Sequence, residues 1–214
     1  MSDGSQLYDA ILNGDNVRAG AIARELLDGG EDPLALVTRH MVPAMDEVGR
    51  RFECEEYFVP ELLLAARAMK AALQHIRPLL AAGGVEPAGR VVIGTVKGDL
   101  HEIGKNLVSA MLEGGGFEVT DLGADVSPER FIEAAGAKKA DIVCLSALLT
   151  VTMPAMKTTI DAFRNAGIRE RVKILIGGAP VTQQYAEEIG ADGYGENAST
   201  AVALARRMLN PVHA

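Results

Sequence analysis

The sequence contains no tryptophan, and aromatic residues make up only 4% of its 214 residues. Its two cysteines, Cys54 and Cys144, are too few for a disulfide framework and favour a reducing compartment. Acidic residues exceed basic ones by 29 to 21, so the net charge is −8, and no basic cluster offsets it. We therefore expect no nucleic-acid partner, because that affinity depends largely on neutralising phosphates.

Long apolar runs are also absent. None approaches the ~18 residues of a membrane span, and residues 1–6 lack the basic-then-apolar pattern of a signal peptide. The GxGxxG and GxxxxGK[ST] motifs are missing too, so the sequence supports neither the common dinucleotide site nor a P-loop. With 48% apolar and 23% charged residues, the chain has a globular composition, and we expect a cytoplasmic protein that does not bind membranes.

The first 82 residues show helical periodicity only. One apolar stripe, which includes Val17, runs over residues 7–27 and ends before two glycines. Asp32-Pro33 is a start signal for the next helix, in which Pro43 is expected to cause a kink or a break. The segment Phe58-Val59-Pro60 opens a further helix. We count four helices and predict a small bundle.

The turn-rich stretch 83–89 marks a boundary, so we predict a helical domain over residues 1–86 and a second domain over 87–214. Beyond it, short apolar segments alternate with helical ones. The expected strands are 91–96, 117–122, 142–146, 172–176 and a short fifth strand next to Gly193-Tyr194. This alternation indicates an α/β domain with a five-stranded parallel sheet. It predicts a flavodoxin-like, Rossmann-like domain with strand order 2-1-3-4-5.

Polar residues and glycines gather where three of these strands end. In an open parallel sheet, ligands bind outside the carboxyl ends of the strands, at the point where the strand order reverses. Here that point lies between the first and third strands. The segments 97–104, 146–152 and 177–180 follow the first, third and fourth strands. We expect them to surround one crevice.

His101 is the most informative residue in the first of these segments. Imidazole is a good ligand for transition metals, and such a ligand usually donates its other N–H to a carboxylate. Asp99, two residues earlier, could accept that hydrogen bond. Taken alone, Asp99-x-His101 is more typical of a loop histidine beside an Asx turn. The pair therefore does not decide between the two interpretations, and Cys144 is interpreted as a small core residue.

Three motifs occur in order at the expected strand ends. They are Asp99-x-His101-x-x-Gly104, then after 41 residues Ser146-x-Leu148, and after a further 28 residues Gly177-Gly178. Their spacing resembles that of the cobalamin-binding domain of methionine synthase and of the corrinoid proteins of methyltransferase systems. Residues 94–106 resemble the methyl-transfer branch in particular. Residues 46–52 and 57–62 resemble that family's helical cap, so the resemblance covers nearly the whole chain.

The resemblance implies a cobalamin cofactor, as methylcobalamin, hydroxocobalamin or a related corrinoid. Its dimethylbenzimidazole base would be displaced from cobalt, the base-off/His-on mode. His101 would take the lower axial position as the cobalt ligand. Asp99 would accept a hydrogen bond from the imidazole, and Thr152 would continue this relay. These three residues would carry the chemistry at cobalt.

The resemblance also implies a slot for the displaced base and its nucleotide tail. Ser146 would contact the base, and Leu148 and Thr150 would line the slot. A side chain at Gly177 or Gly178 would collide with the tail. The other implied cofactor contacts are Gly98, Leu100, Ile103, Gly104, Ala179, Tyr194, Gly195 and Glu196.

The helical domain is expected to cover the upper face of the corrinoid. Phe52 and Val59, with Phe58 next, are the residues expected above the methyl group. Their alternative role is ordinary bundle core, where aromatic residues are often buried. The helical domain must move away for reaction, and Gly83-Gly84 could act as the hinge.

The leading functional hypothesis is a methyl carrier whose cobalt cycles between Co(I) and methyl-Co(III). A substrate-specific methyltransferase would load it, and a second methyltransferase with a folate-type or thiol acceptor would unload it. A reductive activase would restore Co(I). The chain has no residues left for a substrate domain, so we expect a shuttle subunit that is not catalytic alone. Methanol, methylamine, aryl methyl ethers and betaines all remain open as methyl donors.

Three alternatives belong to other classes. A cobalamin-dependent sensor resembles the same two-domain unit, but it usually carries a DNA-binding domain and often a tryptophan above cobalt. A bare flavodoxin-like signalling domain would leave the three motifs as coincidence. Adenosylcobalamin mutase subunits would share the motifs without the helical domain.

Overall fold

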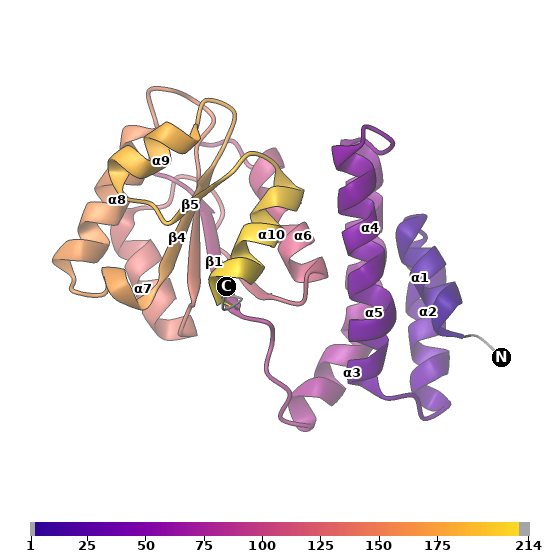
Figure 1. The fold of residues 1–214 in the computed structure, drawn as a ribbon. Coiled ribbons are helices and arrows are strands. Elements are labelled where there is room, and N and C mark those ends of the chain that lie inside the picture. Colours follow the sequence, from indigo (N-terminus) through magenta and orange to yellow (C-terminus); the bar gives the residue numbers. More distant parts are fainter. Residues whose placement is uncertain (1–2, 210–214) are drawn as a thin grey trace. The chain divides into compact units, whose positions relative to one another are not determined.

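The computed structural model describes residues 3–209, which form two compact units (Figure 1). The first unit extends to Pro87 and includes the segment Ala110–Gly116. The second comprises Ala88–Ser109 and the chain from Phe117 onward. None of the helices in this part of the chain is long and apolar enough to cross a membrane.

The first unit is helical, as predicted. Its elements are α1 (Gly4–Leu12), α2 (Asn16–Asp28), α3 (Pro33–Leu36), a π-helical turn (Val37–Met41), α4 (Val42–Glu53) and α5 (Val59–Ala82). Because α3, the π turn and α4 follow one another without a break, the unit has four helical stretches. Leu7, Ile11, Met41, Leu62 and Met69 are among its fully buried side chains.

Two details of this unit differ from the sequence pattern. The stripe over residues 7–27 is two helices, because Gly14 adopts a left-handed φ of 72° and Asp15 caps α2 by accepting a hydrogen bond from the Arg18 N–H. The inward placement of Val17 is wrong, since 78% of this residue is exposed.

Pro43 perturbs its helix, as predicted. A π-helical turn lies directly before α4, and the Val42 N–H donates to the Val37 carbonyl.

The second unit alternates strands and helices. Its strands are β1 (Arg90–Thr95), β2 (Glu118–Asp121), β3 (Ile142–Ser146), β4 (Lys173–Gly177) and β5 (Gly193–Gly195). Its helices are α6 (Ile103–Gly114), α7 (Pro128–Lys138), α8 (Pro154–Asn165), α9 (Gln183–Ile189) and α10 (Ala198–Leu209), with a 3₁₀ turn at Arg169–Arg171. All neighbouring strands pair in parallel in the order β2-β1-β3-β4-β5, which confirms the predicted sheet.

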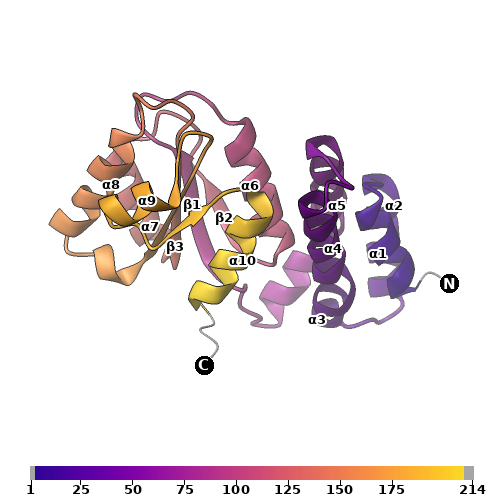
Figure 2. The ribbon, with the colours of Figure 1, turned by 45° about the horizontal axis from the view of Figure 1, so that its top comes forward.

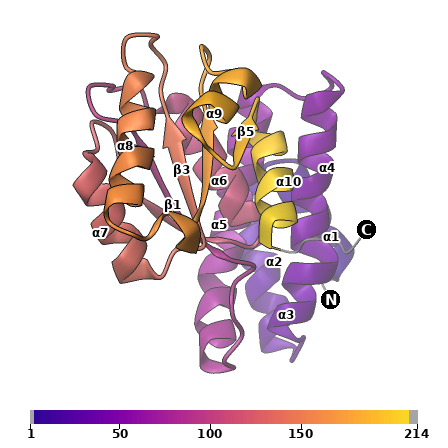
Figure 3. The same cartoon turned by 60° about the vertical axis from the view of Figure 1, so that its left-hand side comes forward.

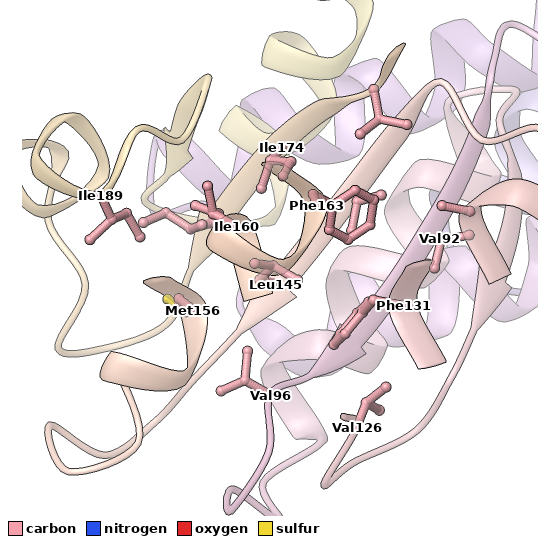
Figure 4. Packing of buried hydrophobic residues seen from close by; sticks show 14 of the residues in the cluster. Val92, Val96, Val126, Phe131, Leu145, Met156, Ile160, Phe163, Ile174 and Ile189 are labelled. Carbon is pink, nitrogen blue, oxygen red and sulfur yellow. The ribbon is translucent and has the colours of Figure 1, made fainter. Parts of the chain in front are cut away.

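One face of the sheet carries a continuous hydrophobic core. Alternate strand residues such as Val92, Leu145 and Ile174 point toward α7–α9, where Phe131 and Phe163 are fully buried (Figure 4). Burial of each such large side chain stabilises the fold by roughly 1.5–3 kcal/mol. Helices α7–α9 cover this face, and α6 and α10 cover the other (Figures 2 and 3).

The strand register brings four small or polar residues into one row. Thr95 pairs with Ser146, Ser146 with Gly177, and Gly177 with Gly195. Each residue is the last of its strand, so the row forms the carboxyl edge of β1, β3, β4 and β5. The loops after β1 and β3 leave the sheet side by side at this edge, which is where the sequence predicts a ligand crevice.

Candidate functional site

A buried carboxylate joins the loops after β1 and β3. Asp99 is only 1% exposed. Its Oδ2 atom accepts hydrogen bonds from the Thr152 hydroxyl at 2.6 Å and the Leu148 N–H at 2.7 Å, with the Leu149 N–H at 3.3 Å. Its Oδ1 atom accepts from the His101 N–H at 3.0 Å and lies 2.8 Å from the imidazole Nδ1. The structure therefore brings Asp99, His101 and Thr152 together.

This carboxylate is held in its ionised form. Burial alone would raise the pKa of Asp99, but the Thr152 hydroxyl, the Leu148 N–H and the His101 N–H and imidazole together hold it well below its usual range. An ionised carboxylate only accepts hydrogen bonds, so Nδ1 of His101 must carry a proton. In this tautomer of a neutral imidazole, Nε2 carries a lone pair and no proton.

The imidazole of His101 is oriented for ligation. Its side chain is 50% exposed, and Nε2 forms no hydrogen bond within the part of the chain that the structure describes. A metal-binding histidine usually has this arrangement, with one nitrogen donating to a carboxylate and the other free for the metal. The geometry thus leaves one imidazole nitrogen available to a metal at the carboxyl edge of the sheet.

Exposed apolar side chains from the same two loops belong to this edge. Leu100 is 75% exposed and Ile103 80%, both from the loop after β1 and the start of α6. From the loop after β3, Leu148 and Leu149 are about two-fifths exposed and Val151 is 81% exposed. Five large apolar side chains exposed on two adjoining loops are more typical of a binding surface than of an ordinary protein surface. They favour a ligand with an apolar surface at this edge of the sheet.

The remaining residues of the predicted slot follow the neighbouring strand ends. Ser146 ends β3, Thr150 is exposed on the loop after it, Ala179 is exposed beyond β4, and Tyr194 is half-buried in β5. Gly98 and Gly104 flank the Asp99–His101 segment. Glu196 follows β5 and is exposed. Their contacts with a ligand stay a prediction.

Gly177 and Gly178 have an additional reason to be glycine. A Cβ atom on Gly178 would overlap the carbonyl oxygen of Ala147, and its φ of 133° is a conformation that other residues rarely adopt. A Cβ on Gly177 would lie 3.0 Å from the carbonyl oxygen of Gly195. Packing within the sheet unit therefore requires glycine at Gly178, independently of any nucleotide tail, whereas a side chain at Gly177 would need Gly195 to shift by only a few tenths of an ångström.

This packing gives a stability prediction. We expect Gly178→Ala to lower the free energy of unfolding by about 3 kcal/mol, through backbone strain and overlap with Ala147. Gly136→Ala, inside α7 with open space around its Cβ, is the control and should raise it by about 0.5–1 kcal/mol. Urea unfolding of both variants checks this. Unchanged stability of Gly178→Ala would show that the packing argument is wrong.

Three residues at this edge were not predicted from the sequence. From the sequence, Thr95 is only part of an expected strand, and Asp125 and Lys105 have no individual role. The structure places Thr95 and Lys105 in the interior, and it places Asp125 against Gly98. Thr95 could have been found from the strand ends, because it occupies the same row as Ser146. Nothing in the residue spacing marks the other two.

The residues expected above the methyl group lie on the first unit. Phe58 is 62% exposed and Val59 is 39% exposed at the start of α5, whereas Phe52 is half-buried near the end of α4. Ordinary bundle core does not describe Phe58 and Val59. The Glu61 side chain accepts from the Phe58 N–H at 2.9 Å, which fixes the start of this helix.

Comparison with known proteins gives family matches over most of the chain. Residues 89–203 match the family model described as "B12 binding domain", and residues 5–77 match a second model with the same description. The two matches fall largely on the sheet unit and on the helical unit respectively.

Individual relatives agree with this. The chain is 44% identical over 188 residues to dimethylamine corrinoid protein 1 of Methanosarcina acetivorans, covering 87% of this chain and 88% of that protein. It is 43% identical over 203 residues to trimethylamine corrinoid protein 1 of the same organism, with 94% of each covered. A crystal structure of the methanol:cobalamin methyltransferase complex from Methanosarcina barkeri matches with a TM-score of 0.85 and 28% identity. That match covers 97% of this chain and 79% of that one.

Proposed function

This chain belongs to the B12-binding corrinoid proteins of methyltransferase systems, and from that premise we propose that it carries a methyl group between two methyltransferases. Its cofactor is a corrinoid of the cobalamin type. The observation that carries the proposal is the His101 imidazole, bound to Asp99 through Nδ1 and open at Nε2. When bound, the corrinoid supplies a cobalt centre that alternates between Co(I) and methyl-Co(III).

The residues at the site fit such a group. His101 would hold cobalt from its lower face through Nε2, in place of the displaced dimethylbenzimidazole base. Asp99 keeps the proton on Nδ1, and the Thr152 hydroxyl, 2.6 Å from its Oδ2, keeps the carboxylate in place. The exposed side chains of Leu100 and Ile103 would lie against the apolar edge of the ring.

The helical unit would exclude water from the upper face. The exposure of Phe58 and Val59 supports this role, because apolar side chains that leave the bundle core are available to cover a ligand. Phe52 would join them. We propose that residues 1–86 act as this cover and 87–214 as the corrinoid-binding domain. Gly83-Gly84 would be the hinge, where Gly84 has a φ of 70° and open space around it.

The carrier role requires other proteins. A related chain crystallised in a complex with its methyltransferase, so methyltransferases are the partner class of the family. We propose a substrate-specific methyltransferase that loads cobalt and a second enzyme that passes the methyl group to a folate-type or thiol acceptor. A reductive activase would restore Co(I), and the site of action would be the cytoplasm. Two relatives are named for methylated amines, which makes a methylated amine the donor to test first.

The proposal is tested by cofactor binding and ligation. The chain incubated with hydroxocobalamin and desalted should retain an equimolar amount of red corrinoid. His101→Ala should change its visible spectrum by removing the imidazole ligand. His75→Ala, an exposed histidine on α5, is the matched control and should leave the spectrum unchanged. A colourless wild-type chain would contradict the carrier role, and an unaltered His101→Ala spectrum would contradict the axial assignment.

A further inference from the structure

Asp99 fixes the imidazole of His101, but the loop that carries both residues has no regular secondary structure from residue 97 to residue 102. We propose that Thr95 and Asp125 position this loop through contacts separate from the Thr152 contact, and so set the direction of the axial ligand. This inference rests on the proposed role of His101. Neither residue touches the imidazole, so both are positioning residues.

Thr95 connects the loop to a strand in the interior of the sheet. It is the last residue of β1, which pairs on both sides with β2 and β3. Its side chain is fully buried, and its hydroxyl donates a 2.8 Å hydrogen bond to the His101 carbonyl. Its own backbone is held as well, because its N–H donates to Gly123 and its carbonyl accepts from Val126. The hydroxyl is thus a fixed point for the loop.

Asp125 holds the earlier half of the same loop. Its two carboxylate oxygens accept from the Gly98 N–H at 2.8 Å and from the Lys97 ammonium at 2.9 Å. Its backbone N–H donates to the Asp99 carbonyl at 2.9 Å. Asp125 itself has a φ of 54°, a left-handed conformation that persists in a non-glycine residue only when surrounding contacts hold it.

Together these contacts determine where the imidazole points. The His101 N–H is bound to Asp99, and the His101 carbonyl is bound to Thr95. The two peptide planes that flank the Cα atom of His101 are therefore both held, and with them the direction of its Cα–Cβ bond. If the Thr95 contact is lost, the peptide plane that contains the His101 carbonyl can rotate. The lone pair of Nε2 then points away from the ligand for part of the time.

The test uses variants that change one atom or group. Thr95→Val removes the hydroxyl and keeps the shape, while Thr95→Ser keeps the hydroxyl and should restore wild-type behaviour. Thr159→Val is the matched control. Thr159 is also fully buried in the sheet unit, but its hydroxyl donates to the Ala155 carbonyl within α8. Asp125→Ala and Asp125→Asn form a second pair, because asparagine keeps an acceptor oxygen and tolerates the left-handed conformation.

The measurement is competition for the lower axial position. Protein labelled with ¹⁵N-histidine is loaded with hydroxocobalamin, reduced to Co(II) and titrated with unlabelled imidazole. Electron paramagnetic resonance then distinguishes the two ligands by nitrogen hyperfine splitting. Loss of one hydrogen bond should lower the half-displacing imidazole concentration about five-fold in Thr95→Val. Thr95→Ser and Thr159→Val should match the wild type. Asp125→Ala should also lower the half-displacing imidazole concentration, and Asp125→Asn should lower it less.

The outcomes distinguish the positioning role of Thr95 and Asp125 from the proposed axial role of His101. If wild-type protein shows no ¹⁵N splitting before imidazole is added, the axial role of His101 is wrong. If the splitting is present and Thr95→Val behaves like wild type, or like an equally impaired Thr159→Val, the positioning role of Thr95 is wrong. Should Thr95→Val not fold, equal behaviour of Asp125→Ala and wild type overturns the inference.

Discussion

Asp99→Ala is expected to lower the free energy of unfolding of the sheet unit by about 2–4 kcal/mol and to abolish the proposed ligation of cobalt by His101. The substitution leaves the N–H groups of Leu148 and His101 without their acceptor, whereas the Thr152 hydroxyl can still donate to the Leu149 carbonyl 2.8 Å away. Each unsatisfied buried group costs about 1–3 kcal/mol. The sum is smaller than two full penalties, because Leu148 and His101 are partly exposed and water can reach them.

Asp99→Asn separates stability from ligation. Its carboxamide oxygen can still accept from the Thr152 hydroxyl and the Leu148 N–H, so the fold should be less affected. Its amide group would then face the imidazole and donate to Nδ1, which shifts the imidazole proton to Nε2. A protonated Nε2 cannot bind a metal. The His101 N–H would lose its acceptor, because it faces the same atom as Nδ1. We therefore expect Asp99→Asn to lose less stability than Asp99→Ala and to lose the ligated spectrum.

Urea unfolding and the visible spectrum of hydroxocobalamin-loaded protein check both variants. Asp161→Asn is the control. This aspartate on α8 pairs with Lys157 and Arg164 at the surface, where such pairs contribute little. A wild-type spectrum in Asp99→Asn would mean that Asp99 does not set the tautomer of His101.

The sheet could be predicted from the sequence because its strands are short, apolar and separated by helical segments. Val91–Val96 and Ile142–Ser146 can be buried only in a sheet covered on both faces, and the strand order follows from that class of fold. The helical unit could be predicted only in part. A helical stripe and a break within it share the same apolar spacing, so Val17 could be placed only once the left-handed Gly14 was known.

Only part of the site could be predicted from the sequence. The segments that hold Asp99, His101 and Thr152 could be grouped from the sequence, because they follow two strands that are adjacent in the predicted order, whereas the relay role of Thr152 is what the family resemblance implies. Asp125 could not, because its role depends on a backbone conformation that aspartate seldom adopts. The packing that requires glycine at position 178 could not be predicted either, because it depends on the position of the Ala147 carbonyl at the end of the neighbouring strand.

Lys105 is the residue whose burial is least expected from the sequence. Its side chain is 1% exposed at the start of α6, and its ammonium group bonds to both carboxylate oxygens of Asp121. The Asn106 side-chain oxygen lies 2.8 Å from it and a Glu102 carboxylate oxygen 3.4 Å. Asp121 ends β2, so this cluster attaches the first turn of α6, two residues beyond His101, to the edge strand.

Lys105→Met is therefore expected to destabilise the sheet unit by about 3 kcal/mol. Breaking a buried ion pair by removing one partner costs roughly 3–5 kcal/mol. We expect the lower end of this range of free energies. Asp121 and Glu102 are 35% and 45% exposed, so their carboxylates regain hydration when the lysine is lost. Asp121→Asn in the Lys105→Met background should recover part of the loss, since it removes one of two carboxylates left facing each other.

The control is Lys157→Met on α8, which breaks a 2.7 Å pair with Asp161. That lysine is 55% exposed, so its pair should contribute less than about 1 kcal/mol. Unfolding is followed in urea, because guanidinium would screen the charges being compared. Equal losses for Lys105→Met and Lys157→Met would show that the buried cluster contributes no more than a surface ion pair. Unequal losses without recovery in the double variant would show that repulsion between Asp121 and Glu102 does not contribute to the cost.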